Sequence, residues 1–365
     1  MSLPELLGHE PVVDGFRRAL ARGRLASSYL FVGPEGVGKR TFALKLARNL
    51  LCERSNPADL APCGECPSCQ QVIAGTHPDI EIISLPEDKR EIPVRLLIGD
   101  AARGRRNKEG FCFNLSRKPS RGGRKIGIID DADRLNEEGA NCLLKTLEEP
   151  PPRSLLILLS NNASSQLPTI RSRCQCMRFQ SLPETHLREL IALTAEVENP
   201  ERAEMLVGME GVTLAESLLW AEDAFWNFRS ELLDVLGRVP LPIDALTQVV
   251  QTFIDQEKTP IDRRKRMVLT FHLAAYFYRL LLRWSVGSDA HIQGGGSIDI
   301  DKTLARAVST ATHSLSRGDG NTIDSLTRMV DRSLAAGQQT SQNANASTVI
   351  GCWANDLSIC FSLMV

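Results

Sequence analysis

A glycine-rich segment, GPEGVGKRT at residues 33–41, follows a short apolar run and precedes a helical pattern. Glycines allow backbone N–H groups to point at a phosphate, a lysine adds positive charge, and the amino end of the next helix adds its dipole. The segment therefore predicts a phosphate-binding loop made of Gly33, Gly36, Gly38, Lys39, Arg40 and Thr41. Arg40 stands where a serine or threonine would hold Mg²⁺, and Thr41 is displaced by one residue, so a degenerate loop without a ligand stays open.

A second acidic element follows the apolar run Ile126–Ile129. Asp130, at the end of this predicted strand, can hold Mg²⁺ beside a nucleotide bound to the loop. Hydrolysing proteins of this kind carry glutamate at the next position, where this chain has Asp131, which is one methylene shorter. Because a general base acts within about 2.6–3.2 Å, we expect reduced hydrolysis. Asp133 is open to another interpretation, as a cap for the helix that follows.

Four cysteines, Cys52, Cys63, Cys66 and Cys69, fall within eighteen residues. Two residues between successive ligands let two thiolates reach one ion from a tight turn, and four thiolates close a structural Zn²⁺ site. Disulfides are the competing interpretation, but the cytosol keeps thiols reduced, and an iron–sulfur cluster is a further alternative. The other cysteines lack metal spacing and are predicted to be small core residues: Cys112, Cys142, Cys174, Cys176, Cys352 and Cys360.

The whole chain has the composition of a soluble globular protein. It has 365 residues, 43 Lys and Arg against 44 Asp and Glu, a formal net charge of −1 and 42% hydrophobic residues. These values exclude a disordered chain and argue against a purely electrostatic nucleic-acid binder. No apolar stretch reaches the roughly 18 residues of a membrane span, and the start of the chain lacks the apolar core of a signal peptide. We therefore expect a cytoplasmic protein without membrane contact.

Apolar runs and helical patterns alternate along the first half of the chain. Residues 29–32, 126–129 and 155–159 read as buried parallel strands, and 10–25, 42–51 and 137–149 as helices. This order predicts an α/β fold with a parallel sheet. After about residue 180 strand signals vanish, and residues 267–284 carry the strongest helical stripe, which we expect to be core. We divide the chain into 1–180, 181–223 and 224–365.

Ten lysines and arginines lie between residues 95 and 125, against only two acids. Such a run can contact the phosphates of duplex DNA, because Lys and Arg contacts dominate nonspecific affinity. A solvated loop beside the sheet is an equally good interpretation. Only Phe111 and Phe113 interrupt the run, so a stacking platform for single strands is not indicated.

The motifs together resemble one family. The phosphate loop, the four-cysteine insert, GGRKIGIIDDADRLN, ANCLLKTLEEPPPRS and LPTIRSRC occur in the order seen in the AAA+ clamp-loader subunits of bacterial DNA polymerase III. The resemblance is firm over residues 8–180 and continues more weakly, with NANASTVIGCWANDLS at 343–358 similar to the closing helix of the delta-prime branch. It implies an AAA+ P-loop domain, a small helical lid and a C-terminal all-helical collar.

Three positions separate the two branches that carry the zinc insert. The gamma/tau ATPases have Ser or Thr at position 40, Glu at 131, and an arginine in a lid turn where this chain has Leu214. All three departures weaken hydrolysis, so the chain resembles the delta-prime branch. An active ATPase of the gamma/tau type is the alternative, and a free-standing zinc-bearing DNA-binding module is a second one from another class.

The resemblance also implies a role for Arg173. In the family the arginine of the SRC motif reaches the γ-phosphate held by a neighbouring gamma/tau subunit, and such an arginine finger raises the rate by about 10³–10⁵. A surface salt bridge is the competing interpretation. Ser160 and Asn161 both lie where a sensor residue would stand. The implied partners are gamma/tau and delta subunits, the sliding clamp and, through the complex, primer–template DNA. The implied cofactors are structural Zn²⁺ and, with less support, ATP with Mg²⁺.

Overall fold

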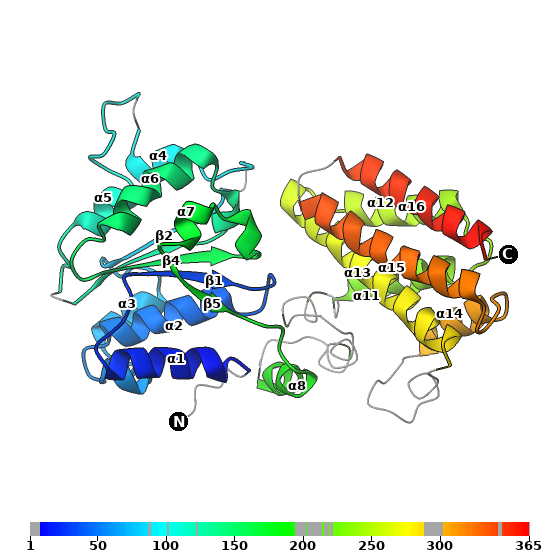
Figure 1. The fold of residues 1–365 in the computed structure, drawn as a ribbon, viewed down its shortest axis with the longest axis horizontal. Helices are drawn as coiled ribbons and strands as arrows, with labels where there is room; N and C mark the ends of the chain where they lie inside the picture. Colours follow the sequence, from blue (N-terminus) through cyan, green and yellow to red (C-terminus); the bar gives the residue numbers. More distant parts are fainter. Residues whose placement is uncertain are drawn as a thin grey trace. The chain divides into compact units, whose positions relative to one another are not determined.

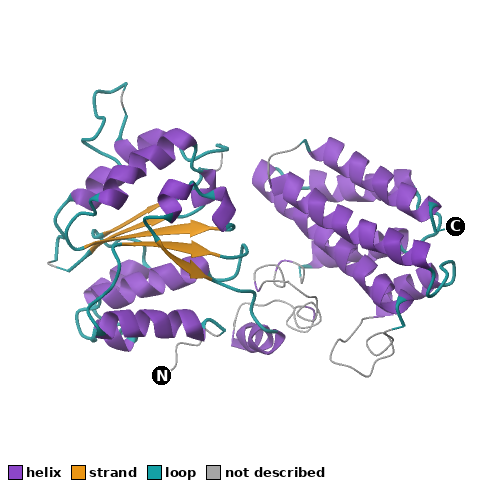
Figure 2. Cartoon of the chain, viewed as in Figure 1, coloured by secondary structure: helices purple, strands orange, loops and turns teal. Residues whose placement is uncertain are grey.

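A computed structural model describes residues 8–86, 89–100, 102–121, 123–193, 202, 214, 219, 222–287, 302–341 and 345–364. Contacts divide the chain into two compact units, Met1–Leu190 and Ile191–Val365. Figure 2 shows all of the described strands in the first unit, whereas the second is drawn with helices alone. Among the described residues no helix is long and apolar enough to cross a membrane.

The first unit is built on a parallel sheet of five strands in the order β2-β3-β4-β1-β5. The strands are β1 (Ser28–Val32), β2 (Ile80–Ile83), β3 (Lys125–Ile129), β4 (Ser154–Ser160) and β5 (Gln175–Arg178). All strands point the same way, so their carboxyl ends share one edge of the sheet and their amino ends share the opposite edge. This polarity decides where each candidate residue lies.

Helices cover both faces of this sheet, with α1, α2 and α3 on one side and α4, α5, α6 and α7 on the other (Figure 1). Their bounds are α1 (Glu10–Ala21), α2 (Lys39–Leu51), α3 (Pro67–Ile73), α4 (Val94–Ile98), α5 (Phe111–Ser116), α6 (Glu137–Glu148) and α7 (Pro168–Arg171). A further helix, α8 (Glu184–Leu193), follows the last strand, and short 3₁₀ turns lie at Pro57–Asp59, Ala132–Arg134 and Ala163–Ser165.

Each central strand is buried on both faces, and its residues alternate between two cores. In β1, Phe31 packs with Phe16 and Phe42 on the α1–α2 side, whereas Leu30 packs with the α4–α6 side. Successive side chains of a strand point to opposite faces, so a sheet covered on both sides needs an unbroken apolar run. This requirement explains why β1, β3 and β4 were predictable from their sequences.

The second unit is a helical assembly around one apolar core. It contains α11 (Asp223–Leu236), α12 (Ile243–Asp255), α13 (Pro260–Ser285), α14 (Lys302–Thr312), α15 (Gly320–Ser341) and α16 (Ala346–Ser362). Trp353 of α16 is fully buried, meets the ring of Phe271 edge-on at 5.0 Å and donates its indole N–H to the Ser333 hydroxyl. The predicted stripe at 267–284 is indeed core, since Phe271, Phe277 and Leu281 are completely buried.

Several sequence-based boundaries need correction. The first helix ends at Ala21 rather than residue 25, and the helix expected at 42–51 already begins at Lys39. Both edge strands, β2 and β5, were missed, because β2 has only four residues and β5 is polar and largely exposed. Most of the predicted lid at 181–223 lies outside the described residues, so the lid and its separation from a collar remain predictions.

Candidate functional site

The predicted phosphate loop lies at the carboxyl edge of the sheet, between β1 and α2. Gly36 and Gly38 have φ values of 75° and 99°, a left-handed region that favours glycine. A Cβ on Gly33 would lie 2.2 Å from the carbonyl oxygen of Phe179, directly after β5, so only glycine fits there. The sequence thus forms the expected strand–loop–helix, and its glycines are required by backbone geometry.

Lys39 is turned back onto this loop and is buried. Its ammonium donates to the carbonyl oxygens of Gly33 at 2.6 Å and Pro34 at 2.7 Å, and to Oδ1 of Asn161 at 3.0 Å. An ammonium has three N–H donors, so all of them have acceptors within the protein. Burial lowers the pKa of Lys39, and nearby acids, Asp133 foremost, act in the opposite direction.

Arg40 is paired with the acid at the end of β3. Its Nε lies 3.0 Å from Oδ2 of Asp130, and the other carboxylate oxygen accepts the backbone N–H of Asp131 at 3.1 Å. Burial and then the charge of Asp131 raise the pKa of Asp130, whereas Arg40 opposes that shift. A bound Mg²⁺ would need the oxygen that Arg40 takes and a hydroxyl that Arg40 replaces. The residues present therefore do not fit Mg²⁺.

The neighbouring acids do not complete a hydrolytic site. Asp131 has a φ of 54° and its Oδ2 accepts the backbone N–H of Leu85 beyond β2. Asp133 is not a helix cap, because Asn136 accepts the N–H of Gly139 and caps α6 instead. The Asp133 carboxylate accepts hydrogen bonds from the turn after β4: the Ser160 and Ser165 hydroxyls, the Asn161 N–H and the Gln166 amide.

The two sensor candidates differ in direction. The single O–H of Ser160 lies between two acceptors, Oδ1 of Asp133 at 2.6 Å and the carbonyl oxygen of Asn162 at 2.8 Å, rather than on the loop. Asn161 faces the loop and accepts from Lys39. The sequence could not show this difference, which depends on β4 lying beside β1, and the sensor role itself stays a prediction.

His9 supports the loop and was missed by the sequence analysis. Its Nε2 lies 2.7 Å from the carbonyl oxygen of Val37, and its ring meets Phe179 edge-on at 5.0 Å. Because a carbonyl only accepts, Nε2 carries the proton. Burial lowers the pKa of His9, which favours the neutral ring, although the hydrogen bond with Val37 acts in the opposite direction. No local sequence signal points to this contact, which spans 28 residues.

Arg173 lies at the other edge of the sheet, between α7 and β5. Its Nη2 donates to Oε1 of Glu148 at 2.7 Å, and its Nη1 donates to the carbonyl of Thr169 at 3.1 Å. The Arg173 side chain is 35% exposed, and Glu148 ends α6 just before β4 begins. Glu148 belongs to the LLKTLEEPP motif, but its sequence gave no reason to pair it with Arg173.

The four cysteines converge, as their spacing predicted, beside the carboxyl end of α2 and the amino end of α3. Their Sγ atoms lie within 4.8 Å of one another, with 3.6 Å from Cys52 to Cys63 and 4.0 Å from Cys63 to Cys69. Zn–S bonds of about 2.3 Å in a tetrahedron place sulfurs about 3.8 Å apart. All four cysteines are free, so this cluster can hold a metal ion.

Backbone groups orient these sulfurs. The N–H groups of Cys63, Cys66 and Cys69 each point at the sulfur of the preceding cysteine at 3.4 Å. N–H donors to metal-bound thiolates are a common feature of zinc sites, because they disperse the negative charge of the sulfurs. The donor set is closed and fits a structural ion with no open coordination position.

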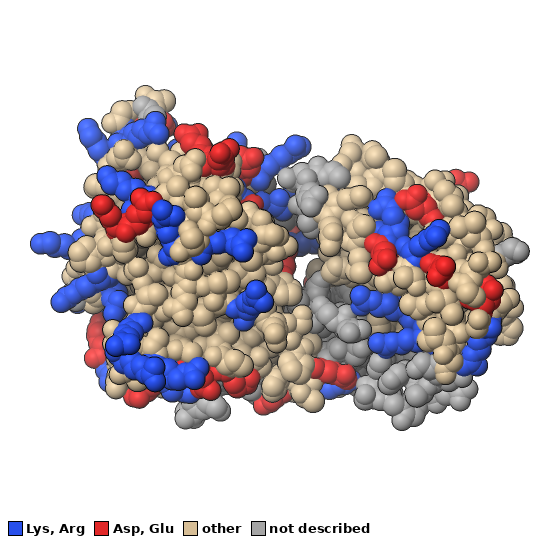
Figure 3. Space-filling view, in the orientation of Figure 1, with Lys and Arg blue, Asp and Glu red and all other residues tan. Residues whose placement is uncertain are grey.

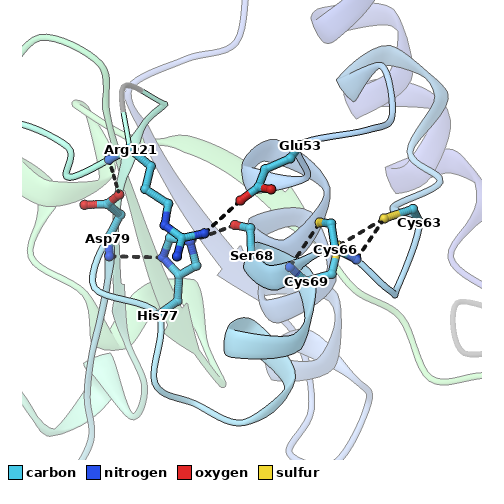
Figure 4. A network of polar contacts seen from close by, with 8 residues as sticks. All are labelled: Glu53, Cys63, Cys66, Ser68, Cys69, His77, Asp79 and Arg121. Atoms are coloured by element: carbon cyan, nitrogen blue, oxygen red, sulfur yellow. Dashed lines mark hydrogen bonds and ion pairs between the residues drawn. The ribbon is translucent and has the colours of Figure 1, made fainter.

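A polar network, buried at Ser68, His77 and Asp79, ties the cysteine cluster to the sheet (Figure 4). Ser68, between two of the cysteines, contacts Nε2 of His77 at 2.7 Å, and Nδ1 of His77 accepts the N–H of Asp79. Asp79 is fully buried and pairs with Lys125, 3.2 Å away at the start of β3. Arg121 donates its backbone N–H to Asp79 and its guanidinium to Glu53. The cluster is therefore anchored to the amino edge of the sheet.

The basic run at 95–125 is not one uniform surface. Lys125 is buried, while Arg103 and Arg105 pair with Asp100 and Glu109. On the face drawn in Figure 3, basic side chains of the first unit are interspersed with acidic ones. The remaining cysteines also divide: Cys174 and Cys360 are buried, but the core prediction is wrong for Cys176 and Cys352, which are exposed.

Comparisons with known proteins agree with these features. Residues 8–183 match the family described as "DNA polymerase III, delta subunit". The DNA polymerase III subunit delta' of Pseudomonas aeruginosa is 40% identical over 153 residues, which are 42% of this chain and 43% of that protein. The subunit delta' of Bacillus subtilis is 29% identical over 215 residues, 59% of this chain and 60% of that protein.

The gamma/tau branch is also similar. The DNA polymerase III subunit gamma/tau of Mycobacterium bovis is 32% identical over 204 residues, 54% of this chain and 32% of that protein. A gamma subunit-related structure from Thermotoga maritima covers 97% of this chain and is itself covered to 99%, with 17% identity and a TM-score of 0.38. In the named delta' and gamma/tau subunits, by contrast, the aligned stretches span less than two thirds of the relatives' own lengths.

These matches confirm the resemblance to the clamp-loader subunits of bacterial DNA polymerase III over the first unit. The structure itself confirms the predicted α/β class, with a parallel sheet in the first unit and helices in the second.

Proposed function

Starting from this resemblance to clamp-loader subunits, we propose that the chain acts as a delta-prime-type subunit. In this role it joins gamma/tau and delta subunits in a complex that opens the sliding clamp and loads it at primer–template junctions. It supplies Arg173 to the nucleotide held by a gamma/tau neighbour, and its own loop does not hydrolyse ATP.

One observation carries this proposal: Arg173 and the chain's own phosphate loop lie at opposite edges of one parallel sheet. Val32, beside the loop, is in register with Arg178, and Arg173 precedes that residue by five positions. At about 3.3 Å per strand residue, the two sites are on the order of 15 Å apart along the strands. Arg173 therefore cannot serve its own loop, and a phosphate that it contacts must come from another subunit.

The chemistry of Arg173 suits this role. A guanidinium stays charged at all relevant pH values and offers planar, forked donors that match phosphate oxygens. Charge that develops on a transferring phosphoryl group is stabilised by such a donor, which is how an arginine finger accelerates hydrolysis. Its contacts with Glu148 and Thr169 fix the side chain near the surface, which supports its availability to a partner.

The cysteine cluster has a structural task in this proposal. We infer that it holds one Zn²⁺, because four thiolates at these separations match a closed tetrahedral site. The ion would fix the segment between α2 and β2. Zn²⁺ supplies no reaction step here, since four cysteines leave no position for water or substrate.

The proposal is tested with a gamma/tau ATPase partner. We expect Arg173→Ala to lower the partner's ATPase rate in the complex by at least about a hundredfold, which is a cautious value for an arginine finger. The matched control is Arg171→Ala, an exposed arginine two residues away. Equal rates for the native chain and Arg173→Ala would reject the role of Arg173. Rapid ATP hydrolysis by the isolated chain, abolished by Lys39→Ala, would instead favour the gamma/tau-type alternative.

A further inference from the structure

Two groups that would share Mg²⁺ in a hydrolysing phosphate loop are joined directly in this chain. They are the residue after the loop lysine, Arg40, and the acid at the end of β3, Asp130. The closest approach, 3.0 Å, is from Nε of Arg40 to Oδ2 of Asp130. The guanidinium thus lies where the hydroxyl and carboxylate ligands of a metal would meet.

Both carboxylate oxygens of Asp130 already have a partner within the chain. One oxygen faces Arg40 and the other accepts the N–H of Asp131, and the side chain is only 24% exposed. Mg²⁺ demands near-ideal octahedral geometry at about 2.0–2.1 Å and gives up its water reluctantly. To bind Asp130 it would have to displace a cation that is part of the chain and cannot lose its charge.

The displaced hydroxyl of Thr41 does not restore the metal site. Successive residues of an α-helix are rotated by about 100°, so Thr41 projects in a different direction from residue 40. The contact with Asp130 is made from position 40, and Thr41 is exposed. The Thr41 hydroxyl therefore does not lie at the position that faces the end of β3, which is position 40.

Lys39, like Arg40, is bound to acceptors of its own chain. Its three donors are taken by two loop carbonyls and Asn161, so the loop is closed by internal contacts without any phosphate. His9 adds a further contact, from its ring to the carbonyl of Val37. A triphosphate would have to break the Lys39 contacts and would arrive without the Mg²⁺ that normally offsets its charge.

We propose that Arg40 is a tethered cation that occupies the magnesium position of this phosphate loop and excludes the metal. The loop is consequently insensitive to Mg²⁺–ATP, and the exclusion depends on a single side chain rather than on decay of the whole loop. Gly33, Gly36, Gly38, Lys39 and Asp130 all keep the residue types that the phosphate and metal need. Replacing Arg40 by a hydroxyl residue should therefore restore a metal-dependent nucleotide site.

The experiment compares thermal unfolding of the native chain and Arg40→Ser, with and without ATP, in the presence or absence of added Mg²⁺; no chelator is used, because it would also remove the metal that we infer in the cysteine cluster. We expect no shift for the native chain in either condition. For Arg40→Ser we expect a rise in Tm of about 5 °C at a hundredfold excess of ATP over its Kd, with Mg²⁺ only. Mn²⁺ in place of Mg²⁺, followed by electron paramagnetic resonance, reports directly on the metal.

Two variants make the result specific. Arg40→Thr repeats the gain with a second hydroxyl residue, and Arg40→Ser with Asp130→Asn should lose it, because the carboxylate ligand is gone. Stabilisation of the native chain by Mg²⁺–ATP would overturn the proposal. Folded Arg40→Ser and Arg40→Thr proteins that bind neither metal nor ATP would also overturn it. Neither result touches the role of Arg173, which is measured on a partner's nucleotide.

Discussion

The basic side chains at the two edges of the parallel sheet differ in their contacts. At the carboxyl edge Lys39 is buried on its own loop, and Arg40 is paired with Asp130 across the strand ends. At the amino edge Arg173 lies at the surface between Glu148 and Thr169. Both arginines are ion-paired within the chain, so what separates them is the partner: Asp130 is the acid that would hold a metal at the loop, whereas Glu148 lies at the opposite edge, away from the loop. Lys39 and Arg40 are thus held at the chain's own phosphate loop, and Arg173 lies at the opposite edge of the same sheet.

The interactions that stabilise the two edges also differ. The amino edge carries the cysteine cluster and the buried pair of Asp79 and Lys125. A buried ion pair costs desolvation but becomes strongly destabilising when one partner is removed, so it fixes the local arrangement. The carboxyl edge depends on glycines and on contacts of single side chains, such as His9. We expect the amino edge to lose more stability when it is perturbed.

The largest effect on folding is expected from loss of the metal site at the amino edge. Cys66→Ser should lower the free energy of unfolding by more than about 3 kcal/mol, because a structural zinc contributes folding free energy directly. Denaturant unfolding and metal analysis check this, with about one zinc per native chain and none in the variant. Cys352→Ser, an exposed cysteine, is the control. A stable, metal-free native chain would refute the zinc assignment.

A smaller effect is expected at the contact that orients Arg173. Glu148→Gln should reduce the partner's kcat by roughly three- to tenfold, since misplaced catalytic groups lose rate even when they remain present. Its Tm should hardly change, because an exposed ion pair contributes about 0–1 kcal/mol at most. Glu149→Gln is the neighbouring control. An unchanged or raised kcat would show that Glu148 does not orient Arg173 for the reaction.

The smallest expected effect is the contribution of His9, at the carboxyl edge, to the pH dependence of stability. Burial holds the pKa of His9 below its ordinary value, so the folded chain binds this proton less readily than the unfolded chain. Stability should therefore fall as the pH drops below about 6.5, with a slope of at most about 1.4 kcal/mol per pH unit for one proton.

Substitution of His9 tests its share of that slope. His9→Gln should flatten the pH dependence, whereas His313→Gln, on an exposed part of the second unit, should leave it unchanged. His77 is also buried with a lowered pKa, so some slope should persist in His9→Gln. Identical slopes for His9→Gln and the native chain would remove His9 from the support of the loop.

Sequence reasoning succeeded where a feature is local or strongly periodic. The spacing of four cysteines between residues 52 and 69 predicted their convergence, since two-residue gaps bring sulfurs together from tight turns. Buried runs such as Ile126–Ile129 predicted central strands. The polar edge strand Gln175–Arg178 lacks that signal, because one side of it has no neighbouring strand and its residues are mostly exposed.

What the sequence could not predict depends on which strands are neighbours. The contact of Asn161 with Lys39 requires β4 beside β1, and the pairing of Arg40 with Asp130 requires α2 to begin near the end of β3. Likewise Arg173 and Glu148 meet only because α6 ends at the edge where β5 begins. The residue types predicted a phosphate loop and left a degenerate one open, but the internal contacts of Lys39 and Arg40 depend on tertiary structure.

The most direct test of the contrast between the two edges compares Lys39→Ala and Arg173→Ala in the same reconstituted complex with a gamma/tau ATPase, by the steady-state kcat for ATP. We expect Lys39→Ala to stay within about twofold of the native complex and Arg173→Ala to fall at least about a hundredfold. A large loss of kcat with Lys39→Ala and none with Arg173→Ala would contradict both claims: that the chain's own loop does not contribute to ATP hydrolysis, and that Arg173 acts on the partner's nucleotide.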